Sequence, residues 1–261
     1  MNYRPIAYSV VIAVLFWTCN LDAEKDPIIV PEIDKEFNID LWEALYPTGR
    51  ELHLQVSTIK NEDCLNAAIA FEHNRIGANI FVSLNEIVTP NDCDPGMAPA
   101  KADINFGSLS AATYNLSLGL KNTIINDGRL QVSYDKYAIT MQTEEGLQFL
   151  HHELRRVPSS AIWGYVAYAQ SADVSAANAI VDAIGNVAYD ADYPPGYYGY
   201  FTIINNTNNL IIKGAPAQGF SKPFLFDYTG NPQQLKDLAT NLRQMYPNTT
   251  LKLWTSDGEE L

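Results

Sequence analysis

The sequence predicts two folded domains: an all-β sandwich of immunoglobulin or fibronectin type at residues 50–141, and an α+β domain of ferredoxin-like type at residues 142–257. Two patterns along the chain lead to this prediction. From residue 51 to 141, apolar and polar residues alternate in short runs, as they do in strands that bury one face. From residue 143 onward, some apolar residues recur at helical spacing and others form continuous runs, a mixture typical of α+β domains.

Residues 19–49 precede these domains and are predicted to form an acidic tether. Pro27 and Pro31 in this segment favour an extended chain. Near its end, four apolar residues recur at the spacing of one helix face, namely Phe37, Leu41, Trp42 and Leu45. They predict a short amphipathic helix that docks on the folded body.

The first domain is predicted from a series of short strands. The clearest strand spans residues 114–120, where Tyr and Leu alternate with Asn, Ser and Gly. Asn126-Asp127-Gly128 lies between two β-rich runs and predicts a hairpin turn. Short strands separated by turn residues favour two sheets packed face to face.

The second domain is predicted from alternating helices and strands. Residues 143–156 indicate a helix, because Thr143 can cap it, two glutamates begin it and two arginines end it. The apolar run at residues 161–169 indicates a strand buried on both faces. Helices are expected at residues 173–185 and 231–245, with strands between and after them. Without the first helix and one optional strand, this order is the split βαβ pattern of ferredoxin-like folds.

Composition and charge exclude one class of partner. The chain of 261 residues has a formal net charge of −13 and contains no cluster of Lys and Arg. Proteins that bind phosphate backbones need clustered cations, so we expect no nucleic acid as a partner. The acidic balance instead keeps an exported protein soluble.

The sequence contains no recognisable catalytic signature. The nucleophile elbow, the glycine-rich phosphate loops and the H-E-x-x-H zinc motif do not occur in it. His151 and His152 are adjacent, and on a helix such neighbours point about 100° apart, away from a shared metal. We therefore predict no catalytic residue, no metal site and no cofactor.

The N-terminus holds an apolar run of twelve residues that ends at Trp17 and is soon followed by Cys19. A membrane-spanning helix needs about 20 apolar residues, so this run is too short to span. The arrangement resembles the signal peptides of Gram-negative bacterial lipoproteins, which end in a cysteine-containing lipobox. Phe16 and Thr18 differ from the residues usual in that motif. The resemblance covers residues 1–26 only.

This resemblance implies a cellular location and a membrane anchor. Residues 1–18 would be a signal peptide, and Cys19 would become the lipidated first residue of the mature chain. The acyl chains would then hold the protein at the outer membrane of the bacterial cell envelope. The acidic tract after Cys19 is similar to that of lipoproteins exposed on the cell surface.

The resemblance also bears on how the two remaining cysteines are paired. If Cys19 is acylated, Cys64 and Cys93 are the one pair left, and exported chains usually form disulfides. We therefore expect Cys64 to be bonded to Cys93. Two free buried thiols are the alternative. A metal pair is a weaker one, because no further Cys or His lies nearby at ligand spacing.

Residues 189–201 form a peak in composition, with tyrosines set among prolines and glycines. Tyrosine is enriched at recognition surfaces, because it offers a large rigid ring with a hydroxyl group. Four tyrosines are a candidate binding patch for a glycan, peptide or protein ligand: Tyr193, Tyr197, Tyr198 and Tyr200. The alternative is an ordinary turn that leads into a strand.

The expected function is therefore that of an exported, lipid-anchored envelope protein with a binding or assembly role and no enzymatic activity. The alternative is an exported hydrolase of glycan or peptide, with carboxylates in a cleft between the two domains. A third reading is a eukaryotic secreted protein, because N-x-[ST] triplets begin at Asn115, Asn205 and Asn248.

Overall fold

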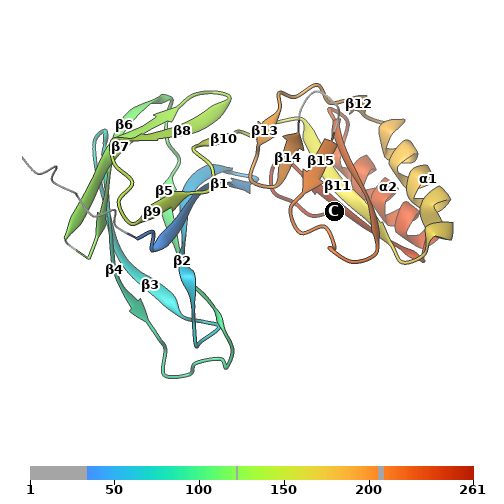
Figure 1. Cartoon of the computed structure of the whole chain (residues 1–261). Coiled ribbons are helices and arrows are strands. Elements are labelled where there is room, and N and C mark those ends of the chain that lie inside the picture. The colour runs from blue at the N-terminus through green and yellow to red at the C-terminus, as the bar shows by residue number, and fades with distance from the viewer. Residues whose placement is uncertain (1–33, 122, 205–208) are drawn as a thin grey trace, which may run out of the picture. The chain divides into compact units, whose positions relative to one another are not determined.

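The computed structural model describes residues 34–121, 123–204 and 209–261 (Figure 1). The predicted signal peptide, Cys19 and most of the tether lie outside these residues. Strands make up 53% and helices 13% of the structure, so the fold is mostly β. Among the described residues, no helix has the length and apolar character needed to cross a membrane.

Ten strands form a large curled sheet (Figure 1). In chain order they are β1 (Phe37–Tyr46), β2 (Gly49–Glu62), β3 (Ala68–Ile76), β4 (Asn79–Val88), β5 (Ala98–Gly107), β6 (Ala112–Leu120), β7 (Ile124–Val132), β8 (Lys136–Met141), β9 (Leu147–Phe149) and β10 (Glu153–Arg155). Their order across the sheet is β10-β8-β7-β6-β4-β3-β5-β2-β1-β9. Hydrogen bonds thus join into one sheet the strands that we expected to divide between two.

The sheet encloses a single large core. Leu41, Leu54 and Ile104 on one wall belong to the same buried cluster as Leu116 and Leu130 on the other. The predicted alternation in β6 is confirmed, because all four of its Tyr and Leu side chains are buried in this cluster. The two outermost strands, β9 and β10, are separated in the chain by residues 150–152 alone.

The predicted helix near Phe37 is wrong, because this segment is strand β1. It pairs with β2 along its whole length and with β9 at its start. Phe37, Leu41 and Leu45 fit a helical spacing, but they fit alternation equally well. Ile39 decides between the two, since it is completely buried beside Phe37 and Leu41 and would lie off the helix face.

The predicted helix at residues 143–156 is also wrong, because the segment forms β9 and β10. Gly146 has φ = 73°, a left-handed conformation that a right-handed helix excludes. Leu147 and Leu154 are both fully buried in the large core. Pairing with the two edges of the sheet therefore outweighs the helix signals, which contribute little without tertiary packing.

The predicted turn at Asn126-Asp127-Gly128 is wrong as well, because these residues lie inside β7. The chain turns after Lys121, which has φ = 49°. Asn126 is completely buried, and its side chain bonds to Thr143 and to the backbone of Glu145. A turn-forming residue is used here to fix a distant loop.

The disulfide between Cys64 and Cys93 is present. Cys64 lies between β2 and β3, and Cys93 lies between β4 and β5. The bond therefore ties together two loops at the same end of adjoining strands.

The rest of the chain contains a four-stranded sheet, two helices and a three-stranded sheet. The first sheet has the order β12-β16-β11-β17 and the second the order β13-β14-β15. Their elements are β11 (Ala161–Tyr168), α1 (Val174–Gly185), β12 (Tyr189–Asp190), β13 (Gly196–Tyr197), β14 (Phe201–Ile204), β15 (Asn209–Ile212), β16 (Phe220–Asp227), α2 (Pro232–Met245) and β17 (Thr249–Thr255).

Strand β11 is buried on both faces, as its continuous apolar run predicts. Ile162 and Val166 pack against α1 and α2, which lie on one face of the sheet (Figure 1). Trp163 and Tyr165 pack on the other side, in a cluster with residues of β14 and β15. Both helices are close to their predicted bounds.

The residues at the N-terminal caps of α1 and α2 differ in their hydrogen bonding. The Asn231 side chain accepts a hydrogen bond from the Gln233 N–H at the start of α2. Asp173 lies at the corresponding position of α1 but makes no capping bond with its side chain. Helix α1 is thus stabilised by its buried stripe, with Ala177, Ile180 and Ile184 all inaccessible to solvent.

Candidate functional site

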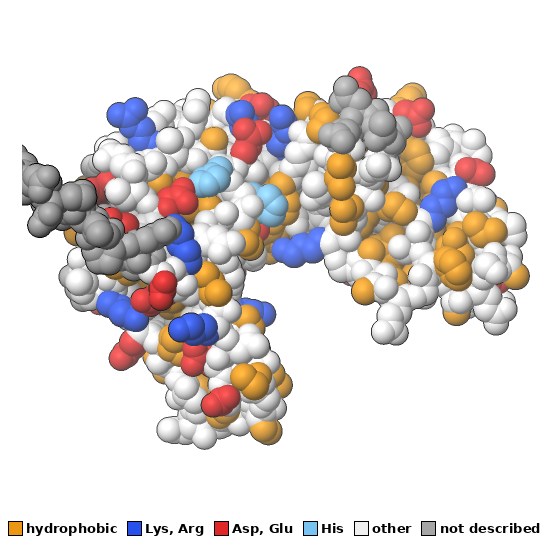
Figure 2. Space-filling view, viewed as in Figure 1, with side chains coloured by type: hydrophobic (Ala, Val, Ile, Leu, Met, Phe, Trp, Pro, Cys, Tyr) orange, Lys and Arg blue, Asp and Glu red, His pale blue; other side chains and the backbone are white. Residues whose placement is uncertain are grey.

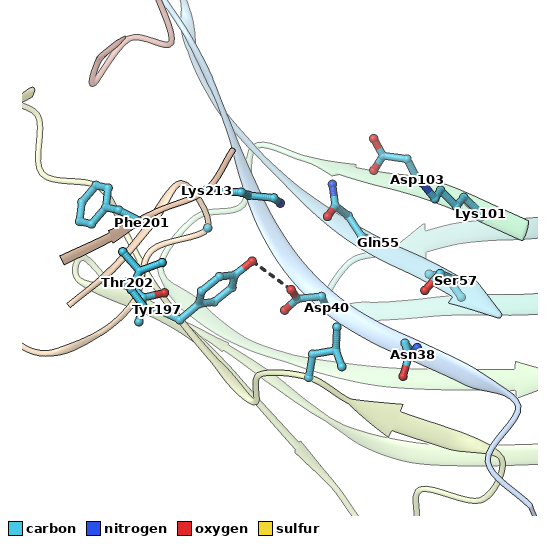
Figure 3. Close-up of a pocket in the computed structure, with 15 residues that line it drawn as sticks. Asn38, Asp40, Gln55, Ser57, Lys101, Asp103, Tyr197, Phe201, Thr202 and Lys213 are labelled. Carbon is cyan, nitrogen blue, oxygen red and sulfur yellow. Dashed lines mark hydrogen bonds between the residues drawn. The ribbon is translucent and has the colours of Figure 1, made fainter. Parts of the chain in front are cut away.

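A groove of about 840 Å³ runs along the outer face of β1, β2 and β5 (Figure 3). The far wall comes from Tyr197, Gly199, Phe201, Thr202, Ile211 and Lys213. Its volume lies within the range of about 300–1,000 Å³ usual for ligand sites. The floor is the solvent-facing side of the large sheet, whose other side is the core.

The floor consists of polar side chains arranged in rows across three strands. Asp40 of β1 pairs with Gln55 of β2, which pairs with Asp103 of β5. The next row holds Asn38, Ser57 and Lys101 in the same order. Neighbouring strands lie about 4.8 Å apart, so the Cα atoms of Asp40 and Asp103 are about 10 Å apart.

Asp40 is held in place by three hydrogen-bonding contacts. Its carboxylate accepts a hydrogen bond from the Leu41 N–H (2.9 Å) and one from the Tyr197 hydroxyl (2.9 Å). His151 Nδ1 lies 3.1 Å from it. The His151 and Tyr197 rings are stacked, with their centroids 3.7 Å apart. Asp40 therefore orients a tyrosine ring at the edge of the groove.

The same contacts explain why the Tyr197 hydroxyl is less acidic than that of a free tyrosine. Burial of the ring, then the negative charge of Asp40 and the hydrogen bond to it, raise the pKa of Tyr197. The neutral phenol is favoured because its ionised form would be poorly solvated and would lie beside a carboxylate. The hydroxyl thus stays a donor throughout the physiological range.

Asp103 is more accessible and has a single partner. His53 Nδ1 lies 2.8 Å from its carboxylate, and the Asp103 side chain is 53% exposed. The His53 ring also packs edge-on against Trp42. His53 Nε2 is buried and has no hydrogen-bond partner among the described residues. Asp103 therefore lines the groove with about half of its side chain open to solvent.

Six other polar side chains of the groove are unpaired. In the part of the chain that the structure describes, none of them has a hydrogen-bond or ion-pair partner: Asn38, Gln55, Ser57, Lys101, Thr202 and Lys213. Figure 3 shows Lys213 directed across the groove toward Gln55. The groove thus offers amide, hydroxyl and ammonium groups that the fold itself does not use.

The four tyrosines of the predicted patch are not brought together on one surface. Tyr197 lines the groove. Tyr198 is buried, stacks on Phe201 and donates a hydrogen bond to the Pro194 carbonyl. Tyr193 donates a hydrogen bond to Asp227. Tyr200 lies half-buried with its ring against Trp42 and Trp163.

Burial also raises the pKa of Tyr198 and of Tyr200, each to about 12. These two rings belong to the packing between the three-stranded sheet and its neighbours. Tyr198 and Tyr200 therefore have the structural role given above as the alternative to a binding patch. Tyr197, which lines the groove, remains a candidate ligand-binding residue.

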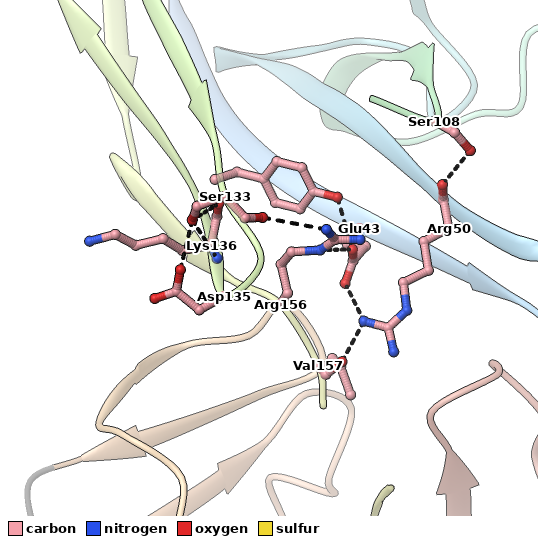
Figure 4. A network of polar contacts seen from close by, with 9 residues as sticks. Glu43, Arg50, Ser108, Ser133, Asp135, Lys136, Arg156 and Val157 are labelled. Atoms are coloured by element: carbon pink, nitrogen blue, oxygen red, sulfur yellow. Dashed lines mark hydrogen bonds and ion pairs between the residues drawn. The ribbon is translucent and has the colours of Figure 1, made fainter. Parts of the chain in front are cut away.

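A second polar cluster lies directly beyond the groove on β1, around a buried carboxylate (Figure 4). Its centre is Glu43, whose side chain is completely buried. The carboxylate accepts hydrogen bonds from Tyr137 (2.9 Å), Arg156 (2.8 Å) and Arg50 (3.3 Å). Arg50 also donates a hydrogen bond to the Val157 carbonyl. This cluster fixes β1 and β2 to the segment that follows β10.

Apart from Tyr197, no pattern in the sequence indicates the groove. Its rows form through strand register, and β1 was predicted to be a helix, so Asn38 and Asp40 were not seen as neighbours of Gln55 and Ser57. His151 was predicted on a helix, whereas it lies between β9 and β10 and contacts Asp40.

Metal ligands and charge patches are sparse in the described residues. No group of three or more His, Cys, Asp or Glu side chains is arranged there to hold a metal ion. On the face shown in Figure 2, basic side chains are scattered among acidic ones.

No protein family, curated protein or solved structure matches the chain at a significant level.

Proposed function

We propose that this chain is an exported, lipid-anchored envelope protein that binds a ligand in the groove. The observation that supports binding is the set of six unpaired polar side chains around Gln55. Buried polar groups are usually paired within the fold, whereas these six half-buried or exposed side chains remain open to a ligand. A concave site with several free polar groups is the usual form of a ligand site.

The proposed export rests on two features of the sequence and one of the structure. The N-terminal run that ends near Cys19 resembles a lipoprotein signal. The disulfide between Cys64 and Cys93 fits an oxidising compartment, where such bonds persist. Lipidation of Cys19 and an outer-membrane location are parts of the same proposal.

We propose in addition that the second part of the chain is ferredoxin-like. The order β11-α1-β12-β16-α2-β17 alternates strands and helices as in a split βαβ unit. The sheet order β12-β16-β11-β17, with each neighbouring pair antiparallel, supports this assignment. The three-stranded sheet is then an insertion between β12 and β16. For the large sheet, the two walls around one core support a sandwich-type relationship.

The anchor is tested by intact-mass analysis of the membrane fraction of bacteria that express the whole chain. We expect a mature chain that begins at Cys19, carries added acyl mass and lacks two thiol hydrogens. A Cys19→Ala variant should lose the acyl mass and leave the membrane fraction. An uncut leader with three reactive thiols would contradict the proposal.

One observation favours the hydrolase as a second candidate. Asp40 and Asp103 point from the same face of the floor, and their Cα atoms are about 10 Å apart. Carboxyl groups about 6.5–9.5 Å apart serve inverting glycosidases. If the protein is a hydrolase, Asp40→Asn and Asp103→Asn should each abolish turnover of a chromogenic glycoside while the protein stays folded.

A further inference from the structure

We infer that the ligand of the groove is an oligosaccharide, recognised through its neighbouring hydroxyl groups. This inference rests on the proposed binding function and names the chemical class of the ligand. It follows from the spacing of the floor, the balance of its charges and the kind of apolar surface beside it.

The floor presents hydrogen-bonding groups on a regular lattice. Side chains on one face recur about 4.8 Å apart across strands and about 6.8 Å apart along them. Asn38 and Gln55 each carry both donors and acceptors, and Ser57 carries a hydroxyl that can do either. A ligand with many closely spaced hydroxyl groups, each also donor and acceptor, can satisfy such a lattice. Sugar chains have this chemistry.

The charges on the floor disfavour other ligand classes. Asp40, Asp103, Lys101 and Lys213 sum to a formal charge of zero, so the groove does not select a highly charged polymer. A lipid chain would bury the ammonium groups of Lys101 and Lys213, which have no hydrogen-bond partner among the described residues, and such burial is costly. An added peptide strand needs a free sheet edge, whereas the floor is a sheet face whose backbone groups are already paired.

The walls supply flat and aliphatic surface for the carbon skeleton of a sugar. Tyr197 lines the groove, and its ring is stacked on His151. Its orientation is fixed in advance by the bond to Asp40, so little side-chain entropy is lost when a ligand packs on it. Leu150 and Ile211 add exposed aliphatic surface at the rim of the same groove.

The test uses the mature chain and a defined set of probes. Cellohexaose, xylohexaose, mannohexaose and chitohexaose are titrated as neutral oligosaccharides, and hexagalacturonic acid as an acidic one, by calorimetry. We expect saturable binding of at least one probe. Gln55→Leu should weaken that binding at least about fivefold, the loss expected for one or two hydrogen bonds.

A matched substitution separates the groove from general effects. Gln131 is an exposed glutamine on β7, outside the groove, and Gln131→Leu should leave binding unchanged. Asn38→Ala serves as a second groove variant in case Gln55→Leu fails to fold. Lys213→Ala should weaken an acidic probe more than a neutral one, because only the acid offers a charge to the ammonium.

Three results would overturn the inference. If no oligosaccharide binds but a random peptide library is retained in a Gln55-dependent manner, the groove is a binding site for another class, and the proposed function survives alone. If oligosaccharides bind equally well to the wild type, Gln55→Leu and Asn38→Ala, the groove is not their site. If neither library binds, the binding function fails as well.

Discussion

Two polar clusters lie on the same strand, and they differ in how completely their groups are paired. The Glu43 carboxylate is completely buried and accepts three side-chain hydrogen bonds. The groove begins at Asp40, three residues earlier, and keeps six polar side chains unpaired within the described chain. The difference separates a cluster built for stability from one available to a ligand.

The largest effect is expected from the Glu43 cluster. Glu43→Gln removes the charge that compensates Arg50 and Arg156, and breaking a buried ion pair costs roughly 3–5 kcal/mol. Urea unfolding should show this loss in the free energy of unfolding. Glu72 is exposed and unpaired in the described residues, so Glu72→Gln should change it by less than about 0.5 kcal/mol. If Glu43→Gln and Glu72→Gln lowered the free energy of unfolding equally, the Glu43 cluster would not be the stabilising one of the two clusters.

A smaller loss is expected at a buried polar residue outside both clusters. Asn126→Ala leaves the Glu145 N–H and C=O without their partner, which costs about 1–3 kcal/mol. The same unfolding experiment measures it, with Asn74→Ala as the exposed control. A neutral Asn126→Ala would mean that saturated hydrogen bonding is a poor guide to stability in this fold.

A gradual effect is expected at alkaline pH. Burial raises the pKa of Tyr198 and Tyr200 to about 12, and burial together with a nearby carboxylate raises that of Tyr137. Unfolded tyrosines ionise near pH 10. Stability is therefore full below pH 10 and falls as the pH rises toward 12 and beyond. Tyr137→Phe should make this fall less steep in urea titrations at pH 8 to 11.5, and an unchanged slope would contradict the assignment.

The smallest effect is expected in the groove. Gln55 makes no side-chain bond within the described chain, so Gln55→Leu should change the free energy of unfolding by less than about 0.5 kcal/mol. Thermal and urea unfolding both report it. A loss of 2 kcal/mol or more would place the groove floor among the structural clusters.

Local sequence patterns correctly predicted the strands and helices whose buried residues recur at one spacing only, that of a strand or that of a helix. The alternation of β6, the apolar run of β11 and the stripes of α1 and α2 are all found where expected. In β1 the apolar residues fit two periods at once, and only pairing with β2 and β9 resolves them. At Gly146, tertiary pairing outweighs an apparent helix.

The candidate site could not be predicted from local sequence patterns, for a different reason. Asp40, Gln55 and Asp103 are far apart in the sequence and meet only through the register of three strands. The tyrosine-rich segment marked one wall of the groove, through Tyr197, but composition alone did not separate it from the buried Tyr198 and Tyr200. The disulfide was predictable because few cysteines were available to pair.

The short connection between β9 and β10 affects the tendency of the protein to self-associate. Leu150 N–H bonds to Ile39, and the His152 carbonyl accepts from Ile139, so residues 150–152 occupy both borders of the large sheet. Uncovered borders are templates on which other extended chains can stack. A single proteolytic nick between Leu150 and His152 should release both borders at once and turn a monodisperse protein into one that self-associates.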